Sequence, residues 1–177
     1  MAGYFSAAAF RTLGTAATPQ NLFTIENIDA TKLVTIRRLA VQIDATAVLT
    51  SVMPQVKVSR ATAVPTGGTA LAKAQFDTGN ASNANTIVRG GNASDGGVAT
   101  AITATAGTTI WQQYCMRMHT VVGQVLAPDN NVLPLLVDTQ DLILRQNQAL
   151  LIQVVASAGA SNPATNHWFA NIVWEED

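Results

Sequence analysis

The chain has 177 residues, of which 48% are hydrophobic and 12% charged, and its 10 Lys and Arg against 11 Asp and Glu leave a formal net charge of −1. A chain of this length can bury enough surface to fold without metals or disulfides, and its hydrophobic share excludes a disordered protein. The balanced charge supplies no basic face for nucleic acid, so we expect no specific nucleic-acid partner. A surface this poor in charge favours association with other chains.

The cysteine content and the absence of long apolar runs restrict the compartment. Cys115 is the only cysteine, which excludes an internal disulfide. No apolar stretch reaches the ~18 residues that span a bilayer, and the first ten residues lack the features of a signal peptide. These features predict a protein made in the cytoplasm, with no membrane partner.

Residues 1–18 are rich in Ala and Thr, with Tyr4, Phe5 and Phe10 as their large anchors. One interpretation is a frayed tail, and the other is an extended arm whose aromatic side chains contact a neighbouring subunit. Both place this segment outside a single domain at 19–177. Both predict that deletion of residues 1–18 leaves the domain folded. The arm interpretation also predicts that the deletion weakens particle binding or multimer formation.

Short strand-like runs separated by turns follow along the chain, and none shows a sustained helical period. The predicted strands are Asn21–Asn27, Leu33–Asp44, Gln55–Arg60, Ile110–Met118, Leu142–Leu144, Leu150–Ala156 and Trp168–Glu175. Several short strands of this kind predict an all-β sandwich or barrel.

Alternation within three of these runs predicts which side chains face the core. In the second run, the largely apolar face consists of Leu33, Thr35, Arg37, Leu39, Val41 and Ile43. In the third run, Val56 and Val58 point inward. In the last run, the predicted core face is Trp168, Ala170, Ile172 and Trp174.

The segment from about 77 to 107 departs from this pattern. It is rich in Gly, Ala, Asn and Thr, carries the pairs Gly90-Gly91 and Gly96-Gly97, and has few large apolar residues. This composition predicts a long surface loop and no core strand.

No catalytic, cofactor-binding or metal-ligating site emerges from the sequence, and we expect no enzyme. The glycine pairs, including Gly67-Gly68, lack the Lys and Ser or Thr of a phosphate-binding loop, so they predict turns with positive φ. Cys115, His119 and His167 do not form a metal-ligand motif. Arg89, in an Arg-Gly-Gly run, is an isolated candidate for a nucleic-acid contact.

Two segments carry a resemblance to a known family. The C-terminal third, VLPLLVDTQDLILRQNQALLIQVVA followed later by NHWFANIVWEE, places apolar strands on both sides of a polar turn at Arg145–Gln148. Near the start, NLFTIENIDATKLVTIRRLAVQ contains an F-T-I-x-N strand that leads to a strand near Lys32–Leu33. Over about 21–177 the chain resembles jelly-roll structural proteins of tailed bacteriophages, although Gln146-Asn147 replaces their frequent proline-glycine turn.

This resemblance implies an antiparallel jelly-roll β-sandwich of the tumour-necrosis-factor-like type, in a homotrimer. It implies a capsid decoration, or cement, protein on the virion surface that binds the major capsid protein and its own copies, with no catalytic residues, cofactor or metal. Two alternatives stay open: a tail- or head-associated adaptor or fibre domain, and a carbohydrate-binding module. The latter would stack sugars on Trp111, Trp168 or Trp174, although aromatic burial in sandwich cores favours core packing for each.

Overall fold

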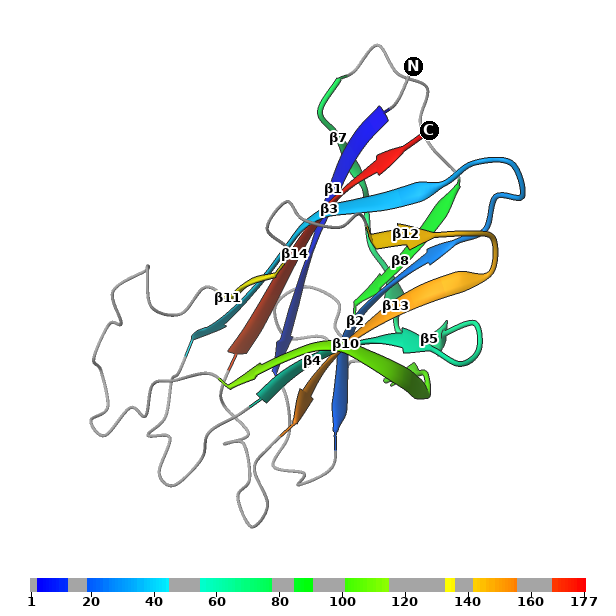
Figure 1. Ribbon diagram of the computed structural model, residues 1–177. Coiled ribbons are helices and arrows are strands. Elements are labelled where there is room, and N and C mark those ends of the chain that lie inside the picture. The colour runs from blue at the N-terminus through cyan, green and yellow to red at the C-terminus, as the bar shows by residue number, and fades with distance from the viewer. Residues whose placement is uncertain are drawn as a thin grey trace, which may run out of the picture.

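The structure of the protein is a computed structural model, drawn in Figure 1. The described residues are 3–12, 19–44, 55–77, 85–90, 101–114, 133–135, 142–155 and 167–177. None of these residues forms a helix long and apolar enough to cross a membrane. The protein is all-β over the described part, and every strand pairing in it is antiparallel.

Two six-stranded sheets carry the fold. The first, called here the β14 sheet, has the order β11 (Leu133–Leu135), β3 (Val34–Asp44), β14 (His167–Glu176), β1 (Gly3–Thr12) and β7 (Ala74–Gln75), and β12 (Leu142–Leu144) also pairs with β3. The second, called the β13 sheet, has the order β10 (Ala106–Tyr114), β4 (Gln55–Ala61), β13 (Gln148–Val155), β2 (Gln20–Asn27), β8 (Thr86–Gly90) and β6 (Thr69–Ala70). A separate short pair joins β5 (Thr66–Gly67) to β9 (Ile102–Thr103).

One hydrophobic cluster draws side chains from both sheets, an arrangement compatible with a β-sandwich. The predicted core face of the last strand is confirmed: the exposed fractions of its four members do not exceed 1%. Val56 and Val58 are fully buried, as their alternation predicts. Because successive side chains of a strand point to opposite faces, the intervening residues of β14 face away from this cluster.

The predicted single apolar face of β3 is wrong over the first half of the strand. Val34 and Ile36 are buried there, whereas Leu39 and Val41 are buried in the second half. The register against β14 shifts at this point, because Val173 pairs with Arg38 and Trp174 pairs with Ile36. Arg37 is therefore the extra residue of a β-bulge. Because one residue is inserted there, the core-facing positions are even-numbered before the bulge and odd-numbered after it.

The expected N-terminal arm is wrong for Gly3–Thr12, which form a strand inside the β14 sheet. β1 pairs with β14 over ten positions, from Gly3 opposite Glu176 to Thr12 opposite His167, and pairs with β7 on its other side. Figure 1 shows β1 and β14 running side by side along the sheet. These residues belong to the folded domain because β14 supplies a partner for their backbone groups, although their side chains are mostly small.

The expected loop at 77–107 is also wrong for part of its length. Thr86–Gly90 form β8, which pairs with β2 and β6 and contributes Val88, 2% exposed, to the core. Its burial alternates strictly along five residues, which is the pattern of a half-buried strand. Residues 78–84 and 91–100 of the expected loop lie outside the described residues.

The turn between β12 and β13 is closed by hydrogen bonds. The backbone N–H of Gln148 donates to the carbonyl of Arg145 at 3.0 Å, and the N–H of Asn147 donates to the carbonyl of Asn27 at 2.7 Å. Asn147 has a φ of 59°, in the left-handed region that Asn tolerates better than most residues. The predicted strands on both sides of this turn are confirmed, and β10 begins four residues before its predicted start.

Candidate functional site

One row across the outward face of β1, β14 and β3 consists of small side chains. Across the three strands, Ala8 lies opposite Asn171, and Asn171 lies opposite Ala40. Ala8 and Asn171 are exposed and Ala40 is half-buried. In the described part of the chain, this row is open to solvent at Ala8 and Asn171, and all three side chains are short.

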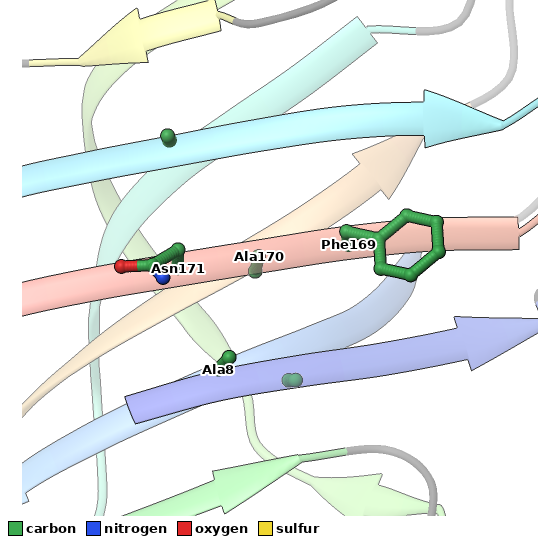
Figure 2. Close-up of a pocket in the computed structure, with 6 residues that line it drawn as sticks. Ala8, Phe169, Ala170 and Asn171 are labelled. Carbon is green, nitrogen blue, oxygen red and sulfur yellow. The ribbon is translucent and has the colours of Figure 1, made fainter. Parts of the chain in front are cut away.

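A hollow of about 240 Å³ lies over this row. Figure 2 shows Phe169 and Asn171 standing on β14 on the same face as Ala8, with Ala170 between them. The Phe169 ring is 39% exposed and forms one wall, whereas Ala170 turns its side chain into the core. The hollow is lined by Ala8, Ala9, Ala40, Phe169, Ala170 and Asn171.

Charge lies toward one end of this face. The Arg37 guanidinium forms an ion pair with Glu175, with 2.7 Å between Nε and Oε2. Glu175 is four residues from Asn171 along β14, which corresponds to about 13 Å at the rise of an extended strand. The bulge that displaces Arg37 from the regular alternation places it beside this carboxylate. The residues that line the hollow are uncharged, and the exposed Arg38 lies two residues from Ala40 along β3.

These residues suit contact with another macromolecular surface. Among the six lining side chains, five are hydrocarbon, and Asn171 supplies an amide that can donate and accept hydrogen bonds. Burial of such a face releases water from apolar area, and two alanines allow a neighbouring backbone to approach closely. We name the set Ala8, Ala40, Phe169 and Asn171 the small-residue face.

The predicted contact residues Tyr4, Phe5 and Phe10 do not act together. Phe5 is 3% exposed and stacks on Trp174 with 5.9 Å between the ring centroids, so the prediction that it contacts a neighbouring subunit is wrong. Tyr4 is 45% exposed, and its role in a contact stays a prediction. The side chain of Phe10 lies outside the described residues.

Sequence reasoning missed Ala8, Phe169 and Asn171, although one signal pointed to two of them. Once the core face of the last strand is assigned, Phe169 and Asn171 must occupy its opposite face. An exposed Phe on that face marks it as unusual for solvent contact. Ala8 had no such signal, because its strand was interpreted as an arm.

The tryptophans expected for a carbohydrate platform are placed differently. Trp168 and Trp174 are fully buried, which confirms core packing for both and removes them as a stacking platform. Trp111 is half-buried and packs against the core cluster.

A cluster of polar side chains lies on the face of the β13 sheet that points away from the hydrophobic core. Thr24 and Arg89 are cross-strand partners on β2 and β8, and Glu26 is two residues further along β2. Thr24 and Glu26 are at most 4% exposed, and one atom in each side chain, together with Arg89 Nε, lacks a hydrogen-bond partner. Arg89 Nη1 donates to the carbonyl of Gly67 at 3.2 Å, so this arginine turns to the protein and not to an external phosphate.

The β5–β9 pair contacts this face through backbone groups. Asn21 Nδ2 donates to the carbonyl of Ile102 at 2.9 Å, and Ile102 is 4% exposed. Gly67 and Gly68 have φ values of 67° and 66°, which confirms the predicted positive-φ turn there. A Cβ on Gly67 would lie 2.5 Å from the carbonyl oxygen of Ala101, so the close approach of the two segments also requires glycine.

Glu26 predicts a specific pH dependence of stability. Burial raises the pKa of its carboxyl, and the positive charge of Arg89 partly offsets the rise. A carboxyl with a raised folded-state pKa contributes stability that is present at low pH and is lost as pH rises through that pKa. Glu26→Gln removes this titration, so we expect the melting temperature of the variant relative to wild type to increase between about pH 3 and pH 7. Thermal unfolding across this range checks it, and a difference that does not change with pH would contradict it.

The remaining candidates for chemistry are not brought together. Cys115 and His119 lie outside the described residues, as does the side chain of His167. Within the described ranges, no three His, Cys, Asp or Glu side chains gather to hold a metal ion.

Comparison of the chain with protein-family models, with curated proteins and with solved structures finds no match.

Proposed function

We propose that this protein is a non-enzymatic structural component of a tailed-phage virion, a decoration protein that binds the major capsid lattice and copies of itself, as a homotrimer. The observation that carries the proposal is the small-residue face: an uncharged row at the centre of a sheet, with a hollow over it and Phe169, 39% exposed, beside it. A freely diffusing protein gains little from such a face, whereas a protein that covers a lattice buries it.

The strand order supports a jelly-roll topology. Long strands that follow one another in the chain alternate between the sheets, since β1 and β3 lie in the β14 sheet whereas β2 and β4 lie in the β13 sheet. The last two strands then insert between the first ones: β14 lies between β1 and β3, and β13 lies between β2 and β4. This interleaving of early and late strands is the winding that a double Greek key produces.

Decoration by such a protein depends on many weak contacts. The small-residue face offers apolar area and one amide, so a single copy binds weakly. When copies are joined, each further contact becomes intramolecular, and overall avidity rises by about 10²–10⁴ without a new kind of contact. Because each copy carries few charges, neighbouring copies repel one another only weakly at close spacing.

Substitution of Ala8 tests the proposal. Ala8→Arg places a long charged side chain in the hollow, and we expect at least about tenfold weaker binding to capsids assembled without this protein, which is roughly the effect of 1.4 kcal/mol. The measurement is quantitative gel analysis of capsids after titration with purified protein.

Ala63→Arg is the matched control, since Ala63 is also an exposed alanine but lies outside the β14 sheet. Equal occupancy by the two variants would contradict the role of the small-residue face. Gold labelling of intact particles gives the location: label over the whole head supports decoration, and label confined to one vertex or the tail supports the adaptor alternative.

A further inference from the structure

The edges of the two sheets differ greatly in length. In the described part of the chain, the edge strands of the β14 sheet are β7, with two residues, and β11 and β12, with three residues each. In the β13 sheet, one edge is β6, with two residues, and the other is β10, with nine. Short edge strands limit unwanted pairing with other sheets. Among these edges, β10 is the one long strand.

The sequence of β10 lacks the usual protection of an exposed edge. Ala106–Tyr114 reads AGTTIWQQY and contains neither a charged residue nor proline. Ile110 is 40% exposed, and Gln112 is also exposed. Natural edge strands are commonly blocked by Lys, proline or an inward-pointing charge. The absence of charge and proline indicates that the part of this edge without a β-bulge accepts a partner strand.

The pairing geometry selects the usable part of this edge. Register shifts against β4 occur between Ala106 and Thr109 and between Thr109 and Trp111. From Trp111 to Tyr114, the pairing with β4 is regular, residue by residue. A regular segment presents evenly arranged backbone groups on its other edge, whereas a bulged segment does not.

We infer that Trp111–Gln113 pairs antiparallel with the same segment of a second copy, about a two-fold axis at Gln112, and so joins two β13 sheets edge to edge. In this isologous contact Gln112 lies opposite its own counterpart, and Trp111 of each copy lies opposite Gln113 of the other. Charged strands resist this arrangement because like charges meet, and the uncharged β10 does not. The inferred contact is independent of the small-residue face and does not require that the protein belong to a virion.

Disulfide trapping tests the contact in purified protein. Residues at the two-fold of an antiparallel pair have Cα atoms about 4.5–5.5 Å apart, within the range that a disulfide bridges. In a Cys115→Ser background, Gln112→Cys leaves one thiol per chain. We expect mild oxidation to convert the Gln112→Cys variant to a disulfide-linked dimer at least about fivefold faster than it converts the Ala70→Cys variant in the same background, as measured on a non-reducing gel. Ala70 is exposed and lies on β6, at the opposite edge of the same sheet.

A charge swap provides a second readout that does not depend on oxidation. Gln112→Lys alone and Gln112→Glu alone bring like charges together and should each lose self-association, whereas a mixture of the two should associate. Affinity-tagged Gln112→Lys is therefore expected to retain untagged Gln112→Glu but not untagged Gln112→Lys.

Three outcomes would overturn the inference. The first is equal disulfide trapping of the Gln112→Cys and Ala70→Cys variants, and the second is equal retention of the two untagged partners in the charge swap. The third is loss of capsid binding by Gln112→Lys while Gln112→Cys traps no faster than Ala70→Cys, which would assign the edge to a strand of another protein.

Discussion

Replacement of Trp174 by alanine is expected to lower the free energy of unfolding by about 3–5 kcal/mol, the range for a buried Trp in a close-packed core. The Trp174 ring is fully buried and stacks on Phe5 across the β1–β14 pairing. Its Nε1–H also donates to Glu176 Oε1 at 2.8 Å. The substitution therefore opens a cavity and removes one partner from a buried carboxylate, and both effects destabilise the folded protein.

The environment of Glu176 makes this loss larger than a cavity alone would produce. Glu176 is 1% exposed, its Oε1 also accepts from the Thr86 hydroxyl at 3.0 Å, and its Oε2 has no hydrogen-bond partner. The bond from Thr86 links β8 in one sheet to β14 in the other. Denaturant unfolding measures the change, and Phe169→Ala on the same strand is the control. Because Phe169 projects from the opposite face and is 39% exposed, we expect a clearly smaller effect. Equal effects of the two substitutions would show that the register of β14 is wrong.

Deletion of residues 1–18 is expected to abolish cooperative unfolding. β1 occupies the sheet between β14 and β7 and contributes Phe5, Ala7 and Ala9 to the core. Without it, the backbone groups of β14 that face β1 lose their partners, and the ring of Trp174 loses its stacking partner. Calorimetry and near-ultraviolet circular dichroism of the truncated chain measure the effect. A sharp transition at the wild-type temperature would contradict the assignment of β1 to the domain.

Two point variants separate the role of β1 from the effects of truncation. Ala7 is 5% exposed and faces the core, whereas its neighbour Ala8 is exposed on the small-residue face. Ala7→Asp buries an unpaired charge, so we expect a loss of several kcal/mol, and we expect Ala8→Asp to change stability by less than about 1 kcal/mol. A frayed tail would tolerate both substitutions equally.

The two proposed surfaces lie on different sheets and serve different contacts. The small-residue face belongs to the β14 sheet and offers apolar area around a hollow, whereas the β10 edge belongs to the β13 sheet and offers backbone hydrogen bonds. If the small-residue face binds the capsid lattice and the β10 edge joins two copies, the two contacts together link copies over the capsid surface. Ala8→Arg and Gln112→Lys test these contacts separately, because neither residue touches the other surface.

Much of the fold could be predicted because its signals are local. Alternation along Trp168–Trp174 places four core residues correctly, since the side-chain period of a strand is two and large apolar residues leave water. The same period places Val56 and Val58. The expectation from the low charge, that the protein associates with other chains, stays a prediction.

Only the tertiary structure decided the remaining features, because each depends on a partner that is remote in sequence. The small side chains of Ala7 and Ala9 bury little area on their own, and β1 becomes a core strand because β14 pairs with it over ten positions. The bulge at Arg37 arises from the register between β3 and β14, with the Arg37–Glu175 ion pair beside it, and it reverses the core-facing positions without a local sequence signal. Residues 86–90 form a strand because β2 and β6 flank them. The small-residue face exists only where β1, β14 and β3 bring Ala8, Asn171 and Ala40 into one row, since no segment of the chain contains all three.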